Sequence, residues 1–202
     1  MAKTALKPVR RGRPPSDAAE SHAAILDAVY ELLQEGSARD LTLEAVAKRA
    51  KVGRPTLYKW WPSKSALVFA LFHERLDRNE AIPGTGTAEE VIRGKVRRLI
   101  GELNGLFGKV LVDLIAEGQS EPGILQDLYE QHIRGRRAAT TADVERGKAA
   151  GEFAADIDPS LLIDSIFSPI FLRRLLRQPP LTERYGDELL DQVLRGARPR
   201  TV

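Results

Sequence analysis

The stretch that decides the fold is KVGRPTLYKWWPSKSAL, residues 51–67. It contains both tryptophans of the chain, Trp60 and Trp61, side by side among basic residues. Pro55 suits the first turn of a helix, where a missing N–H costs nothing, and Pro62 cannot continue one. The spacing therefore predicts a short helix that begins just before Pro55 and ends at Pro62.

The two tryptophans fall on different faces of this predicted helix. With 3.6 residues per turn, Leu57 and Trp61 are four residues apart and point the same way, toward the elements that precede the helix. Trp60 lies at the edge of the opposite face, whose other residues are Pro55, Thr56 and Lys59. We therefore expect Trp61 to be a core residue and Trp60 to be exposed. The alternative is that both tryptophans are buried.

A second short helix precedes this one. Thr42 can cap its N-terminus. Its apolar stripe consists of Leu43, Val46, Ala47 and Ala50. Two short helices joined by a tight turn, the second with polar and basic side chains facing outward, indicate a helix-turn-helix. In this motif the second helix enters the major groove of DNA, which is wide enough for one helix.

The segment LTLEAVAKRAKVGRPTLYKWWPSKSAL, residues 41–67, resembles the N-terminal DNA-binding segment of the TetR family of bacterial transcriptional regulators. The positions that match the usual pattern of this family are Thr42, Ala47, Ala50, Val52, Thr56, Tyr58, Trp61, Lys64 and Leu67. Two residues depart from the pattern, because Lys51 replaces a turn glycine and Gly53 replaces a capping serine. We interpret this exchange as Gly53 supplying the backbone freedom of the turn.

The resemblance implies an all-α protein in which an N-terminal three-helix helix-turn-helix domain is followed by a larger helical ligand-binding and dimerisation domain. It implies that DNA phosphates are held by Thr42, Thr56, Tyr58 and Lys64. Base edges or adjoining sugars would be contacted by Arg54, Pro55, Lys59 and Trp60, with Gly53 beside them at the start of the helix. Among these, Arg54 is best suited to read a guanine through paired hydrogen bonds.

The rest of the sequence has helical periodicity, and we expect about nine helices in all. We divide the chain into a basic, flexible arm (1–16), a helix-turn-helix DNA-binding domain (17–64) and a helical effector-binding and dimerisation domain (65–202). In the arm, Arg11 and Arg13 belong to a sequence of the kind that lies in A·T-rich minor grooves. The alternative is a disordered, solubilising tail.

The C-terminal part of the chain predicts a dimer interface. The segment 159–176 is apolar over more than one face, so it must be buried on more than one side. Together with the last helix, it is expected to form the interface through Leu162, Ile166, Phe167, Ile170, Leu190 and Leu194. A homodimer would match a palindromic operator. The alternative is that these residues close the core of a monomer.

Polar residues on apolar stripes mark candidate effector contacts. His132 shares a face with Leu128 and Tyr129, and Arg136 continues that line. A polar side chain that faces inward needs a partner, which can be a ligand, water or the protein itself. We predict that His132, Arg136 and Asn104 contact a small-molecule effector. The alternatives are a core histidine with a protein partner, and a dimeric DNA-binding or architectural protein with no effector pocket.

Composition narrows the remaining function classes. The net charge is +3 at pH 7, and basic residues concentrate in the first third of the chain, which favours a DNA partner. The chain has no cysteine, which excludes disulfides and cysteine nucleophiles. HERLD (73–77) lacks the second histidine of a zinc helix, and GTGT (84–87) lacks the lysine of a phosphate loop. We expect no enzyme, cofactor, metal or membrane span, and a cytoplasmic location.

Overall fold

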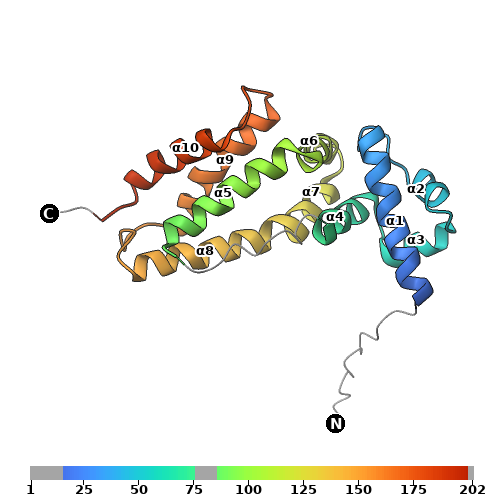
Figure 1. Ribbon diagram of the computed structural model, residues 1–202, viewed down its shortest axis with the longest axis horizontal. Coiled ribbons are helices and arrows are strands. Elements are labelled where there is room, and N and C mark those ends of the chain that lie inside the picture. Colours follow the sequence, from blue (N-terminus) through green and yellow to red (C-terminus); the bar gives the residue numbers. More distant parts are fainter. Residues whose placement is uncertain (1–15, 76–85, 200–202) are drawn as a thin grey trace, which may run out of the picture.

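The computed structural model describes residues 16–75 and 86–199, and every regular element within them is helical. The all-α prediction is confirmed. The elements, labelled as in Figure 1, are α1 (Ser16–Glu35), α2 (Leu43–Arg49), α3 (Arg54–Trp60), α4 (Lys64–Arg75), α5 (Ala88–Asn104), α6 (Leu106–Gly118), α7 (Pro122–Leu128), the π-helical turn η1 (Tyr129–Ile133), α8 (Arg134–Ala149), α9 (Pro159–Leu175) and α10 (Glu183–Arg195).

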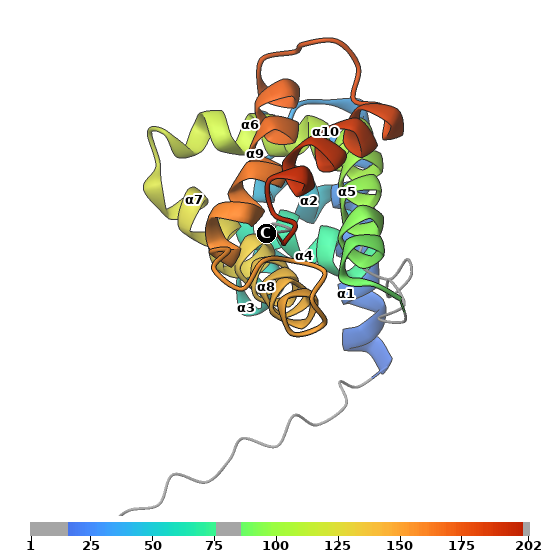
Figure 2. The same ribbon diagram turned by 90° about the vertical axis from the view of Figure 1, so that its left-hand side faces the viewer.

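The molecule has a small head and a longer body. Figure 1 shows α1, α2 and α3 together at one end, the helices from α5 to α10 at the other, and α4 between the two groups. In Figure 2, which looks along the molecule, α9 lies beside α10 and above α8, and α5 lies on the far side of α10. The helix-turn-helix head and the larger helical body thus follow one another as the sequence predicts.

One apolar core holds the head together. Ile25, Val29 and Leu33 recur along one face of α1 and are completely buried. Leu57 and Trp61 of α3 reach the same core, where they are 0% and 6% exposed. Because α3 is only two turns long, these contacts, rather than its own hydrogen bonds, stabilise it. The helical-wheel prediction for α3 is confirmed.

Side-chain caps fix where two of the key helices begin. The Thr42 hydroxyl accepts a 3.1 Å hydrogen bond from the backbone N–H of Ala45, so Thr42 is the N-cap of α2, as predicted. At the start of α5, Thr87 accepts from the N–H of Glu90, whose carboxylate accepts from the N–H of Thr87. This reciprocal capping box satisfies two donors that would otherwise lack partners.

The helix α8 is missing from the sequence-based expectation. The predicted helix through Tyr129 and Ile133 continues in the structure through η1 into α8 and ends at Ala149. α8 is rich in charged residues and threonine, and its buried residues are Thr140, Val144 and Gly147. Because this apolar stripe is weak, the hydrophobic periodicity of the sequence does not reveal α8. The described residues form ten α-helices, close to the predicted number of about nine.

A polar stripe on α6 attaches the body to the head. Lys109, Asp113 and Glu117 follow one another at intervals of four residues. The Lys109 ammonium donates to the carbonyl of Gly36 at 2.6 Å, and Asp113 accepts from the Ser37 hydroxyl at 2.8 Å. Glu117 forms an ion pair of 2.6 Å with the first residue of α4. Lys109 and Asp113 therefore hold the head, and Glu117 holds the start of α4, which joins the head to the body.

α4 belongs to both parts of the molecule. Leu67 is buried in the continuous core, and the ring of Phe72 meets that of Phe107 on α6 edge-on, with centroids 4.9 Å apart. At its N-terminal end, the Ser65 hydroxyl donates to Asp127 on α7 at 2.7 Å. The predicted boundary between residues 64 and 65 falls at the start of this shared helix.

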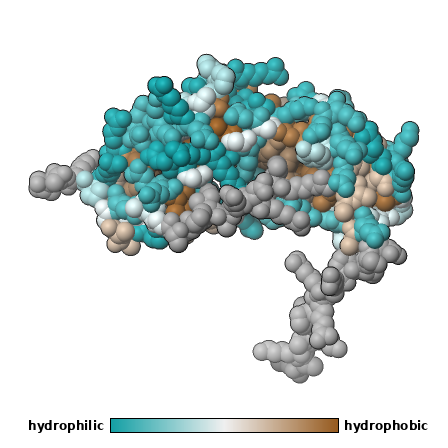
Figure 3. Space-filling view, viewed as in Figure 1, coloured by the Kyte–Doolittle hydropathy of each residue, from teal (hydrophilic) through white to brown (hydrophobic). Residues whose placement is uncertain are grey.

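The face of the molecule that Figure 3 draws is mostly polar. Figure 3 shows hydrophilic side chains over most of this face, with hydrophobic patches near the middle, where the body meets the head. None of the helices in the described part of the chain has the length and apolar character that crossing a membrane requires.

Candidate nucleic-acid interface and pocket

The outward face of α3 gathers the side chains predicted to contact DNA. Arg54, Pro55, Tyr58 and Lys59 are exposed, and Thr56 is half-buried. Pro55 occupies the first turn, and basic charge lies in the last turn. α3 is therefore a short helix with an apolar face in the core and a polar, cationic face in solvent. Such a side can bind both phosphates and base edges.

Trp60 lies at the rim of this face. It is 36% exposed, so the prediction that it is not a core residue is confirmed. The rings of Trp60 and Trp61 each contact His22 of α1, with centroid distances of 5.3 Å and 4.8 Å. These contacts fix the Trp60 ring beside the exposed face. His22 was not identified from sequence, because nothing in its local pattern indicates contact with a helix 40 residues away.

Arg54 is already oriented in the free protein. Its guanidinium forms a 2.8 Å ion pair with Glu44 of α2, and both side chains are largely exposed. An exposed pair of this kind contributes little stability. Arg54 can therefore leave Glu44 for another partner at small cost in free energy.

The turn between α2 and α3 differs from the sequence-based interpretation. Lys51, not Gly53, adopts the left-handed conformation, with φ of +54°. Gly53 has φ of −73° and serves as the N-cap of α3 without a side-chain hydrogen bond. The amide of Val52 donates to the carbonyl of Ala47 at 3.0 Å, which closes the end of α2 and requires the left-handed residue between them. The lysine thus adopts the conformation that glycine favours.

Other predicted DNA contacts are placed as follows. The Thr42 hydroxyl caps α2, so it lies at the N-terminus of that helix. Lys64 is bound to Glu117 and is largely shielded from solvent. Arg11 and Arg13 lie outside the described residues. The DNA-binding roles of all these residues remain predictions.

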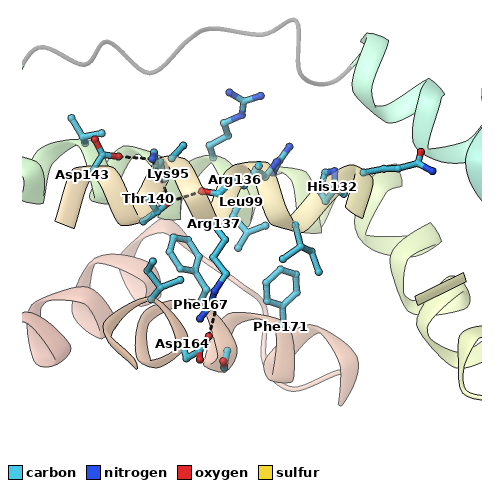
Figure 4. Close-up of a pocket in the computed structure, with 18 of the residues that line it drawn as sticks. Lys95, Leu99, His132, Arg136, Arg137, Thr140, Asp143, Asp164, Phe167 and Phe171 are labelled. Carbon is cyan, nitrogen blue, oxygen red and sulfur yellow. Dashed lines mark hydrogen bonds and ion pairs between the residues drawn. The ribbon is translucent and has the colours of Figure 1, made fainter. Parts of the chain in front are cut away.

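A pocket of about 770 Å³ opens in the body. It lies between α5, α8 and α9 (Figure 4), and His73 of α4 is also among the residues that line it. His132 and Arg136 line it, as predicted, and the His132 ring lies 4.6 Å from that of Phe107. Asn104 does not line it. Its amide instead donates to the carbonyl of Leu181 at 2.8 Å, so its predicted effector contact is corrected.

Ion pairs fix the charged side chains around the pocket. Arg136 and Arg98 both bind Glu102, at 2.6 Å and 3.0 Å. Arg137 of α8 bridges to Asp164 of α9. The hydrogen bond from Arg137 lowers the pKa of the Asp164 carboxyl below its usual value. Opposite charges thus stabilise the ionised form of each group.

Sequence reasoning missed most of the pocket lining. Lys95 and Thr140 come from α5 and α8, and their side chains meet at 3.3 Å. Phe167 was assigned to a dimer interface, but it lines the pocket together with Phe171. Their convergence depends on how three helices pack, which no local pattern in the sequence records.

The expected dimer contacts are also corrected. Five of the six residues are buried within a single chain: Leu162, Ile166, Ile170, Leu190 and Leu194. They close the core of the protomer, as in the alternative considered from sequence. The exposed side of α9 instead presents Leu161, Leu172 and Leu176, which are 67%, 52% and 60% exposed. Exposed Ser165 and Ser168 lie on the same side of the helix.

Comparison with known proteins covers nearly the whole chain. Residues 25–71 match the bacterial regulatory proteins of the tetR family, and residues 82–193 match the tetracyclin repressor-like C-terminal domain. The uncharacterised HTH-type transcriptional regulator YdeS of Bacillus subtilis (strain 168) is 30% identical over 189 residues, which is 94% of each chain.

Solved structures share the fold. The TetR family transcription regulator SCO0332 is 28% identical and superposes with a TM-score of 0.74, covering 89% of this chain and 100% of that one. FadR from Bacillus subtilis, crystallised in complex with stearoyl-CoA, has a TM-score of 0.69 and covers 88% of this chain and 100% of that one. At 20% identity, the second likeness concerns the fold alone.

Proposed function

Because the chain belongs to the TetR family of bacterial transcriptional regulators, we propose that it binds a palindromic operator as a homodimer, represses transcription there, and is released by a small molecule in the α5–α8–α9 pocket. The observation that carries this proposal is the exposed polar face of α3 on a helix whose other face is locked into the core by Leu57 and Trp61. DNA-binding regulators of this kind are not enzymes, and a protein that binds chromosomal DNA works in the cytoplasm.

The side chains of the head divide into two classes of contact. Thr42, Thr56, Tyr58 and Lys64 are proposed to bind phosphates, which sets the register of α3 on the duplex without reading sequence. Arg54 is proposed to read base edges, supported by Pro55, Lys59 and Trp60 at its side. A guanidinium can donate two parallel hydrogen bonds to a guanine, whereas a lysine ammonium cannot.

The proposed dimer uses the exposed side of α9. Leu161, Leu172 and Leu176 form an apolar stripe that a second copy would cover, and the small Ser165 and Ser168 would allow close approach of the partner helix. Two-fold symmetry would then present two α3 helices to successive turns of the major groove, roughly 34 Å apart.

The proposed route from pocket to DNA passes through contacts with α4. His132 borders the pocket and contacts Phe107, which in turn contacts Phe72 of α4. A second connection runs through η1, because it joins pocket-lining α8 to α7, whose Asp127 binds Ser65 at the start of α4. π-helical turns recur at functional sites. A ligand that shifts α8 would therefore act on both ends of α4, and with it on the head.

The alternative of an architectural protein without an effector is less well supported. It gives no use to a pocket of about 770 Å³, a size typical of small-molecule sites, next to the helix that carries the head.

The test begins with recovery of the genomic DNA fragments that the purified protein retains. Footprinting should then show a palindromic site, and light scattering should show a dimer bound to it. Screening small molecules for release from this site follows. Protection of random sequence alone, or a monomer on the operator, would contradict the proposal, and release by no compound in a broad library would favour the architectural alternative.

A further inference from the structure

His22 joins three helices through its side chain. It lies on α1, its ring contacts the indoles of Trp60 and Trp61 on α3, and its Nε2 atom lies 3.3 Å from Oε1 of Glu74 on α4. The side chain is 23% exposed, so most of its surface is covered. A covered ring with partners on two neighbouring helices has few rotamers open to it and can hold the groups that it touches.

The two tryptophans differ in how they are held. Trp61 is 6% exposed and belongs to the apolar core. Trp60 is 36% exposed and ends α3, because the backbone leaves the helix at Trp61, where φ is −133°. The Trp60 ring meets that of His22 edge-on, a favourable arrangement, at 5.3 Å between centroids, and that of Trp61 at 6.3 Å. His22 is therefore the ring contact that ties Trp60 to a helix other than its own.

Glu74 in turn orients His22. An imidazole has two nitrogen atoms, and the partner of one decides which of them carries the proton in the neutral ring. The carboxylate of Glu74 beside Nε2 favours the proton on that nitrogen. Ile25 and Leu26, one turn further along α1, are buried in the core and fix the position of the helix that carries the ring. The position of the Trp60 ring therefore depends on residues of α1 and α4, which lie outside α3.

Order in a contacting side chain favours binding. A side chain that is mobile in the free protein loses freedom when it is pinned against a partner, and a ring already held in its bound position avoids most of that loss. We propose that His22 is a positioning residue for DNA binding, which holds the Trp60 ring where it can meet a base edge or a sugar and does not touch the DNA itself. This inference rests on the proposed function in taking Trp60 as a DNA contact, but the order of the ring can be measured without DNA.

The first test measures the motion of the Trp60 ring. Both tryptophans of the chain lie in this cluster, and Trp61→Phe leaves Trp60 as the one tryptophan while it keeps an aromatic ring in the core. In this background, the nanosecond decay of tryptophan emission anisotropy reports how freely the ring turns. His22→Ala should enlarge the fast part of the decay. His22→Phe, which keeps a flat ring, should leave it nearly unchanged. His22→Gln, which can reach Glu74 but has no ring, should resemble His22→Ala.

The second test asks whether His22 acts through Trp60. The wild-type protein, His22→Ala, Trp60→Ala and the double variant are titrated with the footprinted operator at one salt concentration, and urea denaturation checks that each is folded. His22→Ala should weaken binding about three- to tenfold, and His22→Phe should restore most of that loss. In the Trp60→Ala background His22→Ala should cost less than about twofold, because the ring that His22 positions is absent.

The outcomes separate this inference from the proposed function. Equal losses in the two backgrounds would make His22 a direct DNA contact or a purely structural residue, and an unchanged anisotropy decay in His22→Ala would show that it does not hold the ring; either result overturns the proposal. If operator binding is specific and depends on Trp60 but not on His22, the proposed function stands and this inference is wrong. If the wild-type protein protects no specific site, the proposed function fails and the DNA role of His22 with it, while the decay still shows whether His22 holds the ring.

Discussion

The ammonium of Lys64 lies 2.6 Å from Oε1 of Glu117, so the first residue of α4 is bound to α6 of the body. The same ammonium is the one proposed to hold a DNA phosphate. Glu117 and a phosphate are both anionic, so they would repel each other and compete for the same ammonium. The proposed phosphate contact therefore competes with the ion pair that ties the start of α4 to α6.

Replacing Glu117 should strengthen DNA binding. Glu117→Gln removes the competing charge, so operator affinity should rise about threefold, while the free energy of unfolding falls by up to about 1 kcal/mol because the pair, although largely shielded, is still reached by solvent. Fluorescence anisotropy and urea denaturation measure the two effects. Lys64→Ala is the matched control and should weaken every duplex. If Glu117→Gln also weakens binding, the two anions do not compete.

Arg54 should determine specificity. Arg54→Ala should cost about 1–3 kcal/mol of discrimination between the operator and a scrambled duplex. Tyr58→Phe, which removes a proposed phosphate contact on the same helix, should weaken both duplexes alike. Competition binding at one salt concentration measures both effects. A uniform loss for Arg54→Ala would reassign it to the phosphates.

The turn between α2 and α3 should be open to stabilisation. Lys51→Gly relieves the left-handed conformation and should raise the free energy of unfolding by about 0.5–1 kcal/mol. Gly53→Ser should add roughly a few tenths of a kcal/mol by capping α3. Its new Cβ would meet Pro55 Cδ at 3.6 Å, an ordinary contact. Urea denaturation measures the free energy of unfolding of each variant. Lys51→Ala keeps a side chain in the left-handed conformation and should give no increase.

The exposed leucines of α9 should control assembly. Leu172→Arg places a charge in the middle of the proposed interface and should give a monomer that keeps its helical circular dichroism. Light scattering across a concentration series measures the change. Arg184→Glu, on an exposed side chain of α10, is the control for added charge at the surface. A Leu172→Arg protein that remains a dimer would place the interface elsewhere.

The bridge between Arg137 and Asp164 should be lost in acid. The pKa of Asp164 is lower in the folded protein than in the unfolded chain, so the unfolded chain binds the proton more readily. Its contribution is therefore present above about pH 4 and disappears as pH falls through the lowered pKa. Because Asp164 is largely exposed, the effect is small. The stability difference between wild type and Asp164→Asn should shrink in acid; a constant difference would contradict this.

The sequence predicted what depends on local periodicity. Leu57 and Trp61 were placed in the core from their spacing alone, and Thr42 was placed as a cap from its position before an apolar stripe. The turn was misread because the tertiary packing of two helices outweighs the roughly 1–2 kcal/mol that a left-handed lysine costs. The apolar pattern of segment 159–176 predicted correctly that residues of α9 are buried. It could not say where, because an apolar side chain such as Ile166 suits the core of one chain as well as an interface between two.

The pocket was only partly predictable for a related reason. His132 and Arg136 were found because a polar residue interrupts an apolar stripe. Lys95 and Thr140 lie on helices whose exposed and pocket-facing sides are both polar, so composition cannot separate them. Asn104 looked similar to His132 in sequence, but its partner is a backbone carbonyl 77 residues away.

The polar stripe of α6 has a mechanical consequence. Lys109 and Asp113 hold the head through hydrogen bonds that water can replace one at a time. Tilting the head on this side therefore exposes little apolar surface. Such an attachment lets the head move in small steps, as one hydrogen bond after another is exchanged. In the proposed dimer, two heads attached in this way would tolerate operators whose half-sites lie one base pair closer together or farther apart, which a rigid apolar contact would not allow.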